Sequence, residues 1–96
     1  MGVYKLSKAA NNDIAGIYEF GIENFGIIQA KEYLIGMHNL FQTIAESPNI
    51  GRDASEFALS LQRFAYKSHI IFYLTSTSGI FVVRALHQSM DYQRYL

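Results

Sequence analysis

The sequence predicts an α+β domain, a two-layer sandwich in which two helices cover one face of a four-stranded sheet. A short alternating segment opens the chain, two segments with helical hydrophobic spacing follow, and three strand-like segments joined by tight turns come last. Strands joined by such short loops pair as an antiparallel meander, and the helices must pack on the sheet to bury their apolar stripes. A chain of 96 residues, half of them hydrophobic, fits one domain over residues 1–96.

The N-terminal segment predicts a strand followed by a helix. Apolar and polar side chains alternate over residues 3–6. Ser7 suits a helix N-cap, because its hydroxyl can accept a hydrogen bond from a free amide of the first turn. From Lys8 onward, apolar residues recur at helical spacing as far as Phe25, and Gly26 is placed to end the helix in a left-handed conformation.

A second helix is predicted from Ala30 to Ala45, where apolar residues step by three and four. Ser47 and Pro48 end it, because the residue before a proline is disfavoured in a helix. The few residues between the two helices, around 25–28, permit an antiparallel helical hairpin.

Three strands are predicted in the second half, after a polar connector at residues 47–60. They are Leu61–Tyr66, His69–Thr75 and Ile80–Leu86, separated by short turns. With the N-terminal strand they complete the predicted four-stranded sheet.

Alternation along the strands divides their side chains between a helix-covered face and an open face. Arg84 carries a charge that is costly to bury without a partner, so we expect it on the open face. The helix-covered face is then predicted to hold Tyr4, Leu6, Phe64, Ile70, Phe72, Leu74, Phe81, Val83 and Ala85. The open face is predicted to hold Val3, Lys5, Leu61, Arg63, Ile71, Tyr73, Ile80, Val82, Arg84 and Leu86.

An open face this apolar indicates a binding surface, because monomeric proteins rarely expose such a patch. We expect a partner chain to contact Arg63, Ile71, Tyr73, Ile80, Val82, Arg84 and Leu86. The alternative is that loops or the C-terminal tail fold over this face.

Charge is unevenly distributed along a chain whose net charge is zero. Residues 8–47 carry two basic and five acidic side chains, whereas residues 48–96 carry five basic and three acidic ones. The zero total argues against a general nucleic-acid binder, and the basic second half favours an acidic partner over chance variation. The lack of cysteine, of a signal-peptide pattern and of a long apolar run indicates a soluble cytoplasmic protein without a membrane segment.

Candidate catalytic residues lie in the second half of the chain. His69, Arg63, Arg84 and His87 could together cleave RNA, since the histidines could move protons and the arginines could stabilise the crowded phosphate. Their spacing is not diagnostic, and a histidine at a strand end is more often structural. The chain has no glycine-rich phosphate loop and its three dispersed histidines lack a metal-binding pattern, so we expect no cofactor and no metal.

Several short motifs, taken in order, resemble those of a known family. They are Tyr4-Lys-Leu-Ser-Lys-Ala-Ala, Phe25-Gly26, Ala45-Glu-Ser-Pro48, Arg63-Phe64, Ser68-His69-Ile-Ile-Phe-Tyr73 and Val83-Arg84-Ala-Leu-His87-Gln-Ser-Met-Asp91. Over essentially its whole length the chain resembles ParE toxins of the RelE/ParE superfamily, the toxin halves of bacterial type II toxin–antitoxin modules. The predicted element order is the fold that this resemblance implies.

The resemblance implies a non-enzymatic toxin that inhibits DNA gyrase and blocks replication. It also implies neutralisation by a ParD-like antitoxin in a hetero-oligomeric complex, with no sequence-specific DNA binding by the toxin itself. The C-terminal tail is a candidate for contact with the target through His87, Met90, Asp91, Tyr92 and Arg94.

The main alternative is a RelE-like, ribosome-dependent mRNA endonuclease on the same fold. Such nucleases are generally strongly basic, whereas this chain is neutral. Many of them carry an arginine just inside the third strand, where this chain has Ile70 after His69. A second alternative is a relative that binds its antitoxin but is not toxic.

Overall fold

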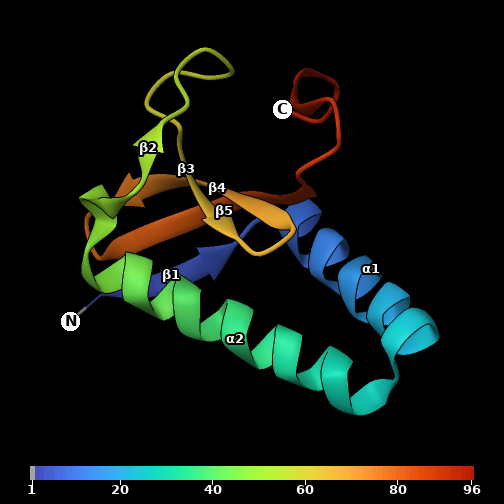
Figure 1. Ribbon diagram of the computed structural model, residues 1–96. Helices are drawn as coiled ribbons and strands as arrows, with labels where there is room; N and C mark the ends of the chain where they lie inside the picture. Colours follow the sequence, from blue (N-terminus) through green and yellow to red (C-terminus); the bar gives the residue numbers. More distant parts are fainter. Residues whose placement is uncertain (1) are drawn as a thin grey trace.

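The structure is a computed structural model that describes residues 2–96. Within this range the chain forms two helices and five strands (Figure 1), namely β1 (Val3–Leu6), α1 (Lys8–Phe25), α2 (Ile27–Glu46), β2 (Arg52–Asp53), β3 (Gln62–Tyr66), β4 (His69–Ser76) and β5 (Gly79–His87). The predicted α+β fold, with an N-terminal strand, a helical hairpin and a meander, is confirmed. Among the described residues, neither helix is both long and apolar enough to cross a membrane.

The sheet has five strands across residues 2–96, not the four that the sequence predicts, in the order β1-β5-β4-β3-β2. It is mixed, because β1 runs parallel to β5 while the other neighbours are antiparallel. The additional strand, β2, consists of two residues that pair with Arg63 and Gln62. Two residues are too few to show the alternation typical of a strand, and they lie in the segment that was predicted to be a polar connector.

α1 begins and ends where its capping residues predict, whereas α2 runs from Ile27 to Glu46 and so begins before the predicted Ala30. The Ser7 hydroxyl accepts a hydrogen bond from the Ala10 amide at 2.9 Å and donates one to the Val83 carbonyl at 2.6 Å. It therefore caps α1 and joins that helix to β5. Gly26 separates the helices with a φ of 89°, a conformation that glycine adopts readily. Figure 1 shows the hairpin lying over one face of the sheet, with the turn between the helices projecting beyond it.

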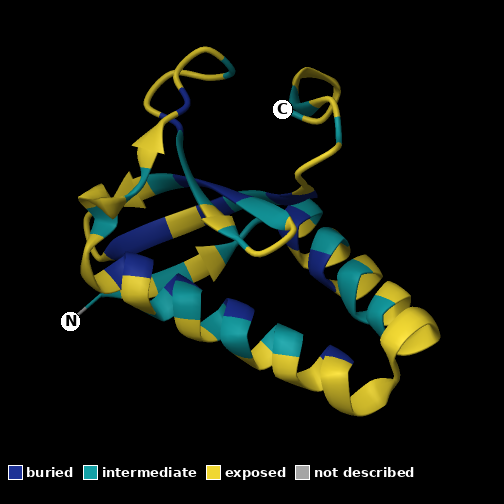
Figure 2. Cartoon of the chain, in the orientation of Figure 1, coloured by how far each residue is buried: buried dark blue, intermediate teal, exposed yellow. Residues whose placement is uncertain are grey.

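The sheet is covered on both faces (Figure 2). The helix-side core joins the two helices to the sheet through Ala10, Ile14, Met37, Phe41, Ile44, Ala45, Ile71, Tyr73, Ile80, Val82 and Ala85. The tail-side core, on the opposite face, is built around Ala54, Leu61, Phe72 and Leu86, with Phe57, Ile70, Leu74, Val83, Met90, Tyr92 and Leu96 packed against them.

The predicted division of the strands between the two faces is partly wrong. Four residues predicted on an open face, Ile71, Tyr73, Ile80 and Val82, are at most 1% exposed in the helix-side core. Ile70, Phe72, Leu74 and Val83, which were predicted under the helices, pack in the tail-side core, and Phe81 is 38% exposed. The prediction holds for Tyr4, Leu6, Phe64 and Ala85, which belong to the helix-side core.

A β-bulge in β5 accounts for part of this error. Phe72 pairs with Arg84 while the next residue, Tyr73, pairs with Val82, so Val83 has no opposite residue. An extra residue of this kind breaks the strict two-residue alternation and places Val82 and Ala85 on the same face. The rest of the error reflects β4, where Ile70–Leu74 is apolar on both faces and composition alone does not say which face the helices cover.

The tail and the loop between β2 and β3 cover the second face. The Phe57 ring lies 6.0 Å from the Phe72 ring, and the Tyr92 ring lies 5.2 Å from it, measured between ring centroids. Leu61 and Leu86 are therefore buried on the face that was predicted for them, but by the chain itself. The alternative in which loops and the tail fold over the open face is confirmed.

Candidate functional site

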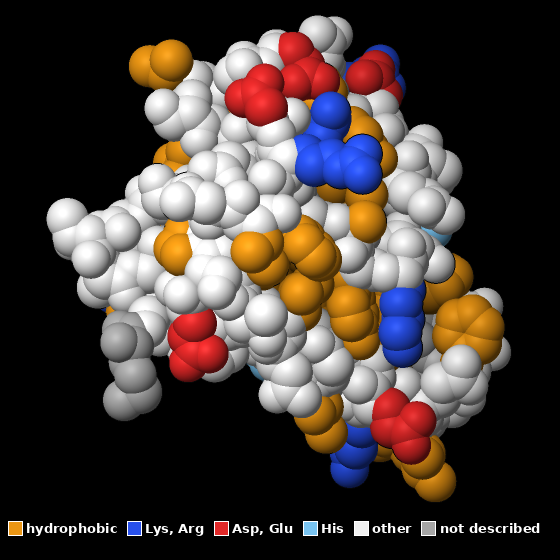
Figure 3. Space-filling view, turned by 60° about the vertical axis from the view of Figure 1, so that its left-hand side comes forward, with side chains coloured by type: hydrophobic (Ala, Val, Ile, Leu, Met, Phe, Trp, Pro, Cys, Tyr) orange, Lys and Arg blue, Asp and Glu red, His pale blue; other side chains and the backbone are white. Residues whose placement is uncertain are grey.

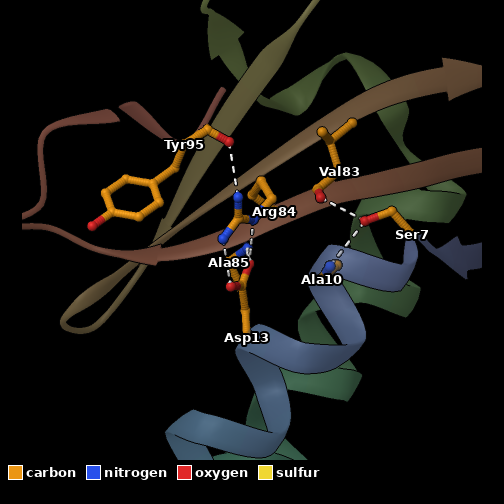
Figure 4. Close-up of polar contacts among 7 residues, drawn as sticks. All are labelled: Ser7, Ala10, Asp13, Val83, Arg84, Ala85 and Tyr95. Atoms are coloured by element: carbon orange, nitrogen blue, oxygen red, sulfur yellow. Dashed lines mark hydrogen bonds and ion pairs between the residues drawn. The ribbon is translucent and has the colours of Figure 1, made fainter. Parts of the chain in front are cut away.

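Arg84 is held in place by contacts within the chain (Figure 4). Its Nε and Nη2 donate hydrogen bonds to the two carboxylate oxygens of Asp13 at 2.7 and 2.8 Å. Its Nη1 donates to the Tyr95 carbonyl at 2.8 Å, and the Tyr95 ring lies against the guanidinium. The hydrogen bonding of Arg84 to the Asp13 carboxylate is the main reason that the pKa of Arg84 is raised. Arg84 thus joins α1, β5 and the tail.

Arg63 lies on the tail side of the sheet. It pairs across the strands with Phe72, and its Nη1 is 3.4 Å from a carboxylate oxygen of Glu56. With 33% of its side chain exposed, Arg63 is open enough to contact a partner. An ion pair this exposed contributes little to stability.

The two candidate histidines lie together on the helix side. His69 opens β4 and His87 ends β5, the two residues are paired across the strands, and their ring centroids are 5.4 Å apart. The Nδ1 atom of His69 lies 2.6 Å from the hydroxyl of Tyr33 on α2. The sheet therefore separates the two histidines from Arg63, and Arg84 is engaged by Asp13. The four residues proposed for RNA cleavage do not converge on one reacting group.

Burial disfavours a charge on His69. Desolvation lowers its pKa below the usual histidine range, the nearby His87 lowers it further, and Asp13 opposes both effects. Burial also raises the pKa of the Tyr33 hydroxyl. At neutral pH the pair is a neutral imidazole beside a neutral phenol, which can exchange hydrogen bonds but lacks the charge of a phosphate-cleaving centre.

A groove of about 1310 Å³ runs between the helices and the ends of β4 and β5. Its apolar wall includes Phe20, Phe25 and Ile28 near the hairpin turn, and these three side chains are 60%, 59% and 74% exposed. At the other end it is lined by Tyr33, Lys67, Ser68, His69 and His87. Figure 3 shows from one side how hydrophobic side chains reach the surface in a band with Lys and Arg side chains beside it.

Sequence reasoning did not find this groove. The signal available was that Phe20, Phe25 and Ile28 are large apolar residues beside the hairpin turn, where two helices leave the sheet and cannot cover each other fully. Among residues 2–96, no group of three or more His, Asp or Glu side chains is arranged to hold a metal ion.

A sequence model of the family described as "ParE toxin of type II toxin-antitoxin system, parDE" matches residues 4–92. The chain belongs to this ParE toxin family. The resemblance seen in the sequence motifs is therefore confirmed.

Two relatives support the membership of the ParE family along the full chain. The protein is 35% identical over 94 residues to Toxin ParE1 of Mycobacterium tuberculosis, covering 97% of this chain and 96% of that one. It is 30% identical over 96 residues to Toxin ParE1 of Caulobacter vibrioides, covering 100% of this chain and 99% of that one.

The ParE fold is also recognised in three dimensions. The chain is similar to a solved structure titled "Chromosomal ParDE TA system from P. aeruginosa", with a TM-score of 0.76, 13% sequence identity, and coverage of 91% of this chain and 96% of that one. At this identity the likeness shows the fold alone.

The tail of this ParE family member is divided between packing and exposure. Met90 and Tyr92 pack in the tail-side core, whereas Asp91 and Arg94 are exposed. His87 is exposed, and its Nδ1 is 2.7 Å from the Ser89 hydroxyl. The candidate residues of the tail thus do not form one surface.

Proposed function

We propose that this chain inhibits DNA gyrase and so blocks replication, and that a ParD-like antitoxin neutralises it. The observation that carries the proposal is the family match over residues 4–92, together with ParE1 relatives along the full length. The separation of the two histidines from Arg63 by the sheet, with Arg84 engaged by Asp13, supports a non-enzymatic toxin over an mRNA endonuclease.

We place the antitoxin in the groove, not on the sheet face that the sequence suggested. Ile71, Tyr73, Ile80 and Val82 are buried under the helices and present no surface, whereas the groove exposes apolar side chains along the hairpin and the Lys67 ammonium group at its head. An amphipathic antitoxin segment would bury Phe20, Phe25 and Ile28 and meet Lys67 with acidic side chains. From the sequence-based set, Arg63 remains accessible at the other face.

The exposed side of the tail is our candidate for the gyrase contact. Met90 and Tyr92 anchor the tail to the tail-side core, and this leaves Asp91 and Arg94 directed to solvent on an ordered support. A contact there would leave the groove free for the antitoxin.

The toxic target can be tested by expressing the chain in cells and following DNA and protein synthesis separately. We expect DNA synthesis to stop first, and the purified protein to inhibit supercoiling by gyrase. Arg94→Glu should weaken this inhibition, while Lys8→Glu, an exposed charge change on α1, serves as the matched control. Cleavage of mRNA on translating ribosomes with gyrase unaffected would overturn the proposal in favour of the nuclease.

The antitoxin site can be tested with two isoleucines of α2. Ile28 lines the groove and is 74% exposed, whereas Ile35 is 60% exposed and does not line it. We expect Ile28→Asp to weaken binding of the ParD-like antitoxin of the same module and Ile35→Asp to leave it unchanged. Equal loss from both variants would place the antitoxin outside the groove.

A further inference from the structure

A pair of tyrosines builds the head of the groove. The Tyr33 hydroxyl lies 3.4 Å from the Tyr66 carbonyl oxygen, and the Tyr66 hydroxyl donates a hydrogen bond to the Tyr33 carbonyl at 3.1 Å. Gly36 makes room for this arrangement, because a Cβ atom there would overlap the Tyr66 hydroxyl. The two rings, with centroids 5.0 Å apart, fix α2 against the end of β3.

Lys67 is positioned by these rings and lacks an acidic partner within the described residues. It lies in the turn between β3 and β4 with a φ of 51°, and its Nζ is 5.4 Å from the ring centroids of both Tyr33 and Tyr66. Across residues 2–96, no carboxylate oxygen lies within ion-pair distance of this ammonium group. The aromatic faces attract the cation and hold it at the groove without neutralising it.

The two imidazoles that line the groove with Lys67 have hydrogen-bonding capacity to spare. The Ser89 amide donates to Nδ1 of His87 at 3.1 Å, so the neutral ring carries its proton on Nε2. His69 uses Nδ1 for its contact with the Tyr33 hydroxyl. Both rings line the groove. The groove head is thus lined by one ammonium group and two imidazoles.

We propose that Lys67, His69 and His87 bind a carboxylate of the antitoxin segment that fills the groove, and that His69 takes up a proton when they do so. This inference rests on the proposed function, because it names the chemistry that the antitoxin presents to the groove head. Lys67 supplies an ammonium group, and His69 supplies the charge that depends on pH.

The hydrogen bonds at His69 can accommodate the added proton. A protonated Nδ1 donates to the Tyr33 hydroxyl oxygen, and the Tyr33 hydroxyl proton turns toward the Tyr66 carbonyl, which already lies 3.4 Å away. In neither the neutral nor the protonated form of His69 do two hydrogen-bond donors point at each other. In the free protein, burial lowers the pKa of His69, so the ring is neutral at neutral pH. A carboxylate beside it raises that pKa, and binding must then become tighter as the pH falls.

The other charged groups that face His69 do not prevent it from taking up a proton when a carboxylate binds. Asp13 of α1 is engaged by Arg84, and Glu32 of α2 lines the groove as an exposed carboxylate. Tyr33, Tyr66 and Lys67 complete the surroundings from α2 and the β3–β4 turn, and His87 does so from β5. His69 is the group whose protonation the proposal invokes, and the His69→Gln variant isolates its share of the pH dependence.

A carboxylate suits the site better than a phosphate of a nucleic acid. The groove continues from the cationic head along Phe20, Phe25 and Ile28, an apolar wall that a peptide side chain fills and a sugar-phosphate chain does not. The net charge of zero also gives no general attraction for nucleic acid.

The test measures the affinity of the whole toxin for the ParD-like antitoxin of its module at about pH 6 and about pH 8. We expect tighter binding at the lower pH, and the gain approaches tenfold for each unit by which the complex raises the pKa of His69 only as the pH falls below the pKa of the free protein. Lys67→Met should weaken binding at both pH values, and His69→Gln should remove most of the pH dependence. Lys31→Met, an exposed charge on α2 that does not line the groove, is the matched control and should bind as the wild type does.

Ring-proton NMR titration of His69 in the free toxin and in the complex gives a second measurement that does not depend on a variant folding. We expect a higher pKa of His69 in the complex. This inference would be overturned if the affinity were the same at both pH values, the His69 pKa were the same in the free toxin and in the complex, and Lys67→Met bound the antitoxin as Lys31→Met does. The proposed function would remain intact. A rise in that pKa with a single-stranded RNA oligonucleotide but not with the antitoxin would also overturn it. If no complex forms at all, the proposed antitoxin partnership itself fails.

Discussion

Asp13 and Arg84, 71 residues apart in the sequence, form a two-pronged ion pair that joins the first helix to the last strand. The same carboxylate accepts a hydrogen bond from the Ala85 amide at 3.0 Å. β1 pairs with β5 only as far as Val82. Beyond that point, side chains of the N-cap and first turns of α1 bond the backbone of β5 instead. The Ser7 hydroxyl donates a hydrogen bond to the Val83 carbonyl, and the Asp13 carboxylate accepts one from the Ala85 amide. These side chains therefore bond the backbone of β5 where a neighbouring strand would otherwise do so.

Removing the Asp13 carboxylate should therefore destabilise the fold. Asp13→Ala leaves Arg84, whose side chain is 19% exposed, without its acidic partner and the Ala85 amide without its acceptor. We expect a loss of about 2–3 kcal/mol in the free energy of unfolding, measured by urea denaturation. Glu19→Ala, at an exposed position of the same helix, is the control and should change it by less than about 0.5 kcal/mol. A loss no greater than that of the control would mean that the pair is not needed for stability.

Gly51 should resist substitution because of the buried Tyr73. The Tyr73 hydroxyl donates to the Pro48 carbonyl at 2.8 Å and accepts from the Gly51 amide at 2.9 Å, so a Cβ atom at position 51 would overlap it. We expect Gly51→Ala to cost about 1–3 kcal/mol in unfolding free energy. The same substitution in a Tyr73→Leu background should cost less, because the hydroxyl and the ring carbons that the Cβ atom would overlap are both gone. Equal costs in the two backgrounds would assign the effect to the backbone.

Gly16 should behave in the opposite way. It lies inside α1 at an exposed position, and a Cβ atom there would meet no heavy atom within 4 Å. Gly16→Ala should raise the free energy of unfolding by about 0.5–1 kcal/mol, because alanine loses less conformational entropy in a helix. Gly21→Ala, whose Cβ would lie 3.1 Å from the Ala30 Cβ, should gain less. Thermal unfolding of the two variants side by side would show equal gains at the two positions if helix propensity alone decided the outcome.

The sequence was sufficient for the order and type of the larger elements because each is signalled locally. Ser7 and Gly26 mark the ends of α1 by their own backbone and side-chain preferences, and the short turn at Lys67 and Ser68 fixes the pairing of β3 with β4. Signals of this kind depend on a few neighbouring residues, and they hold whatever the rest of the chain does.

The sidedness of the sheet could not be predicted, because it depends on contacts made by distant residues. Arg84 lies on the tail side opposite Phe72, the face predicted for it, but its partner Asp13 comes from α1, and the bulge at Val83 changes the alternation of the strand residues before it. The tail-side core likewise exists because Tyr92 returns to Phe72 from the far end of the chain. The groove was missed for the same reason, since its head and its wall come from different parts of the sequence.

His69 makes the stability of the free protein depend on pH. Its folded-state pKa lies below that of an unfolded histidine, chiefly because of burial, so the unfolded chain binds more protons. The contribution of His69 is complete above the unfolded pKa of about 6.5 and is lost as the pH falls through that value toward the folded pKa. Urea denaturation at about pH 7.5 and about pH 5.5 should therefore show a larger loss for the wild type than for His69→Gln, which has no imidazole to protonate. Equal losses would show that the burial of His69 does not disfavour its charged form.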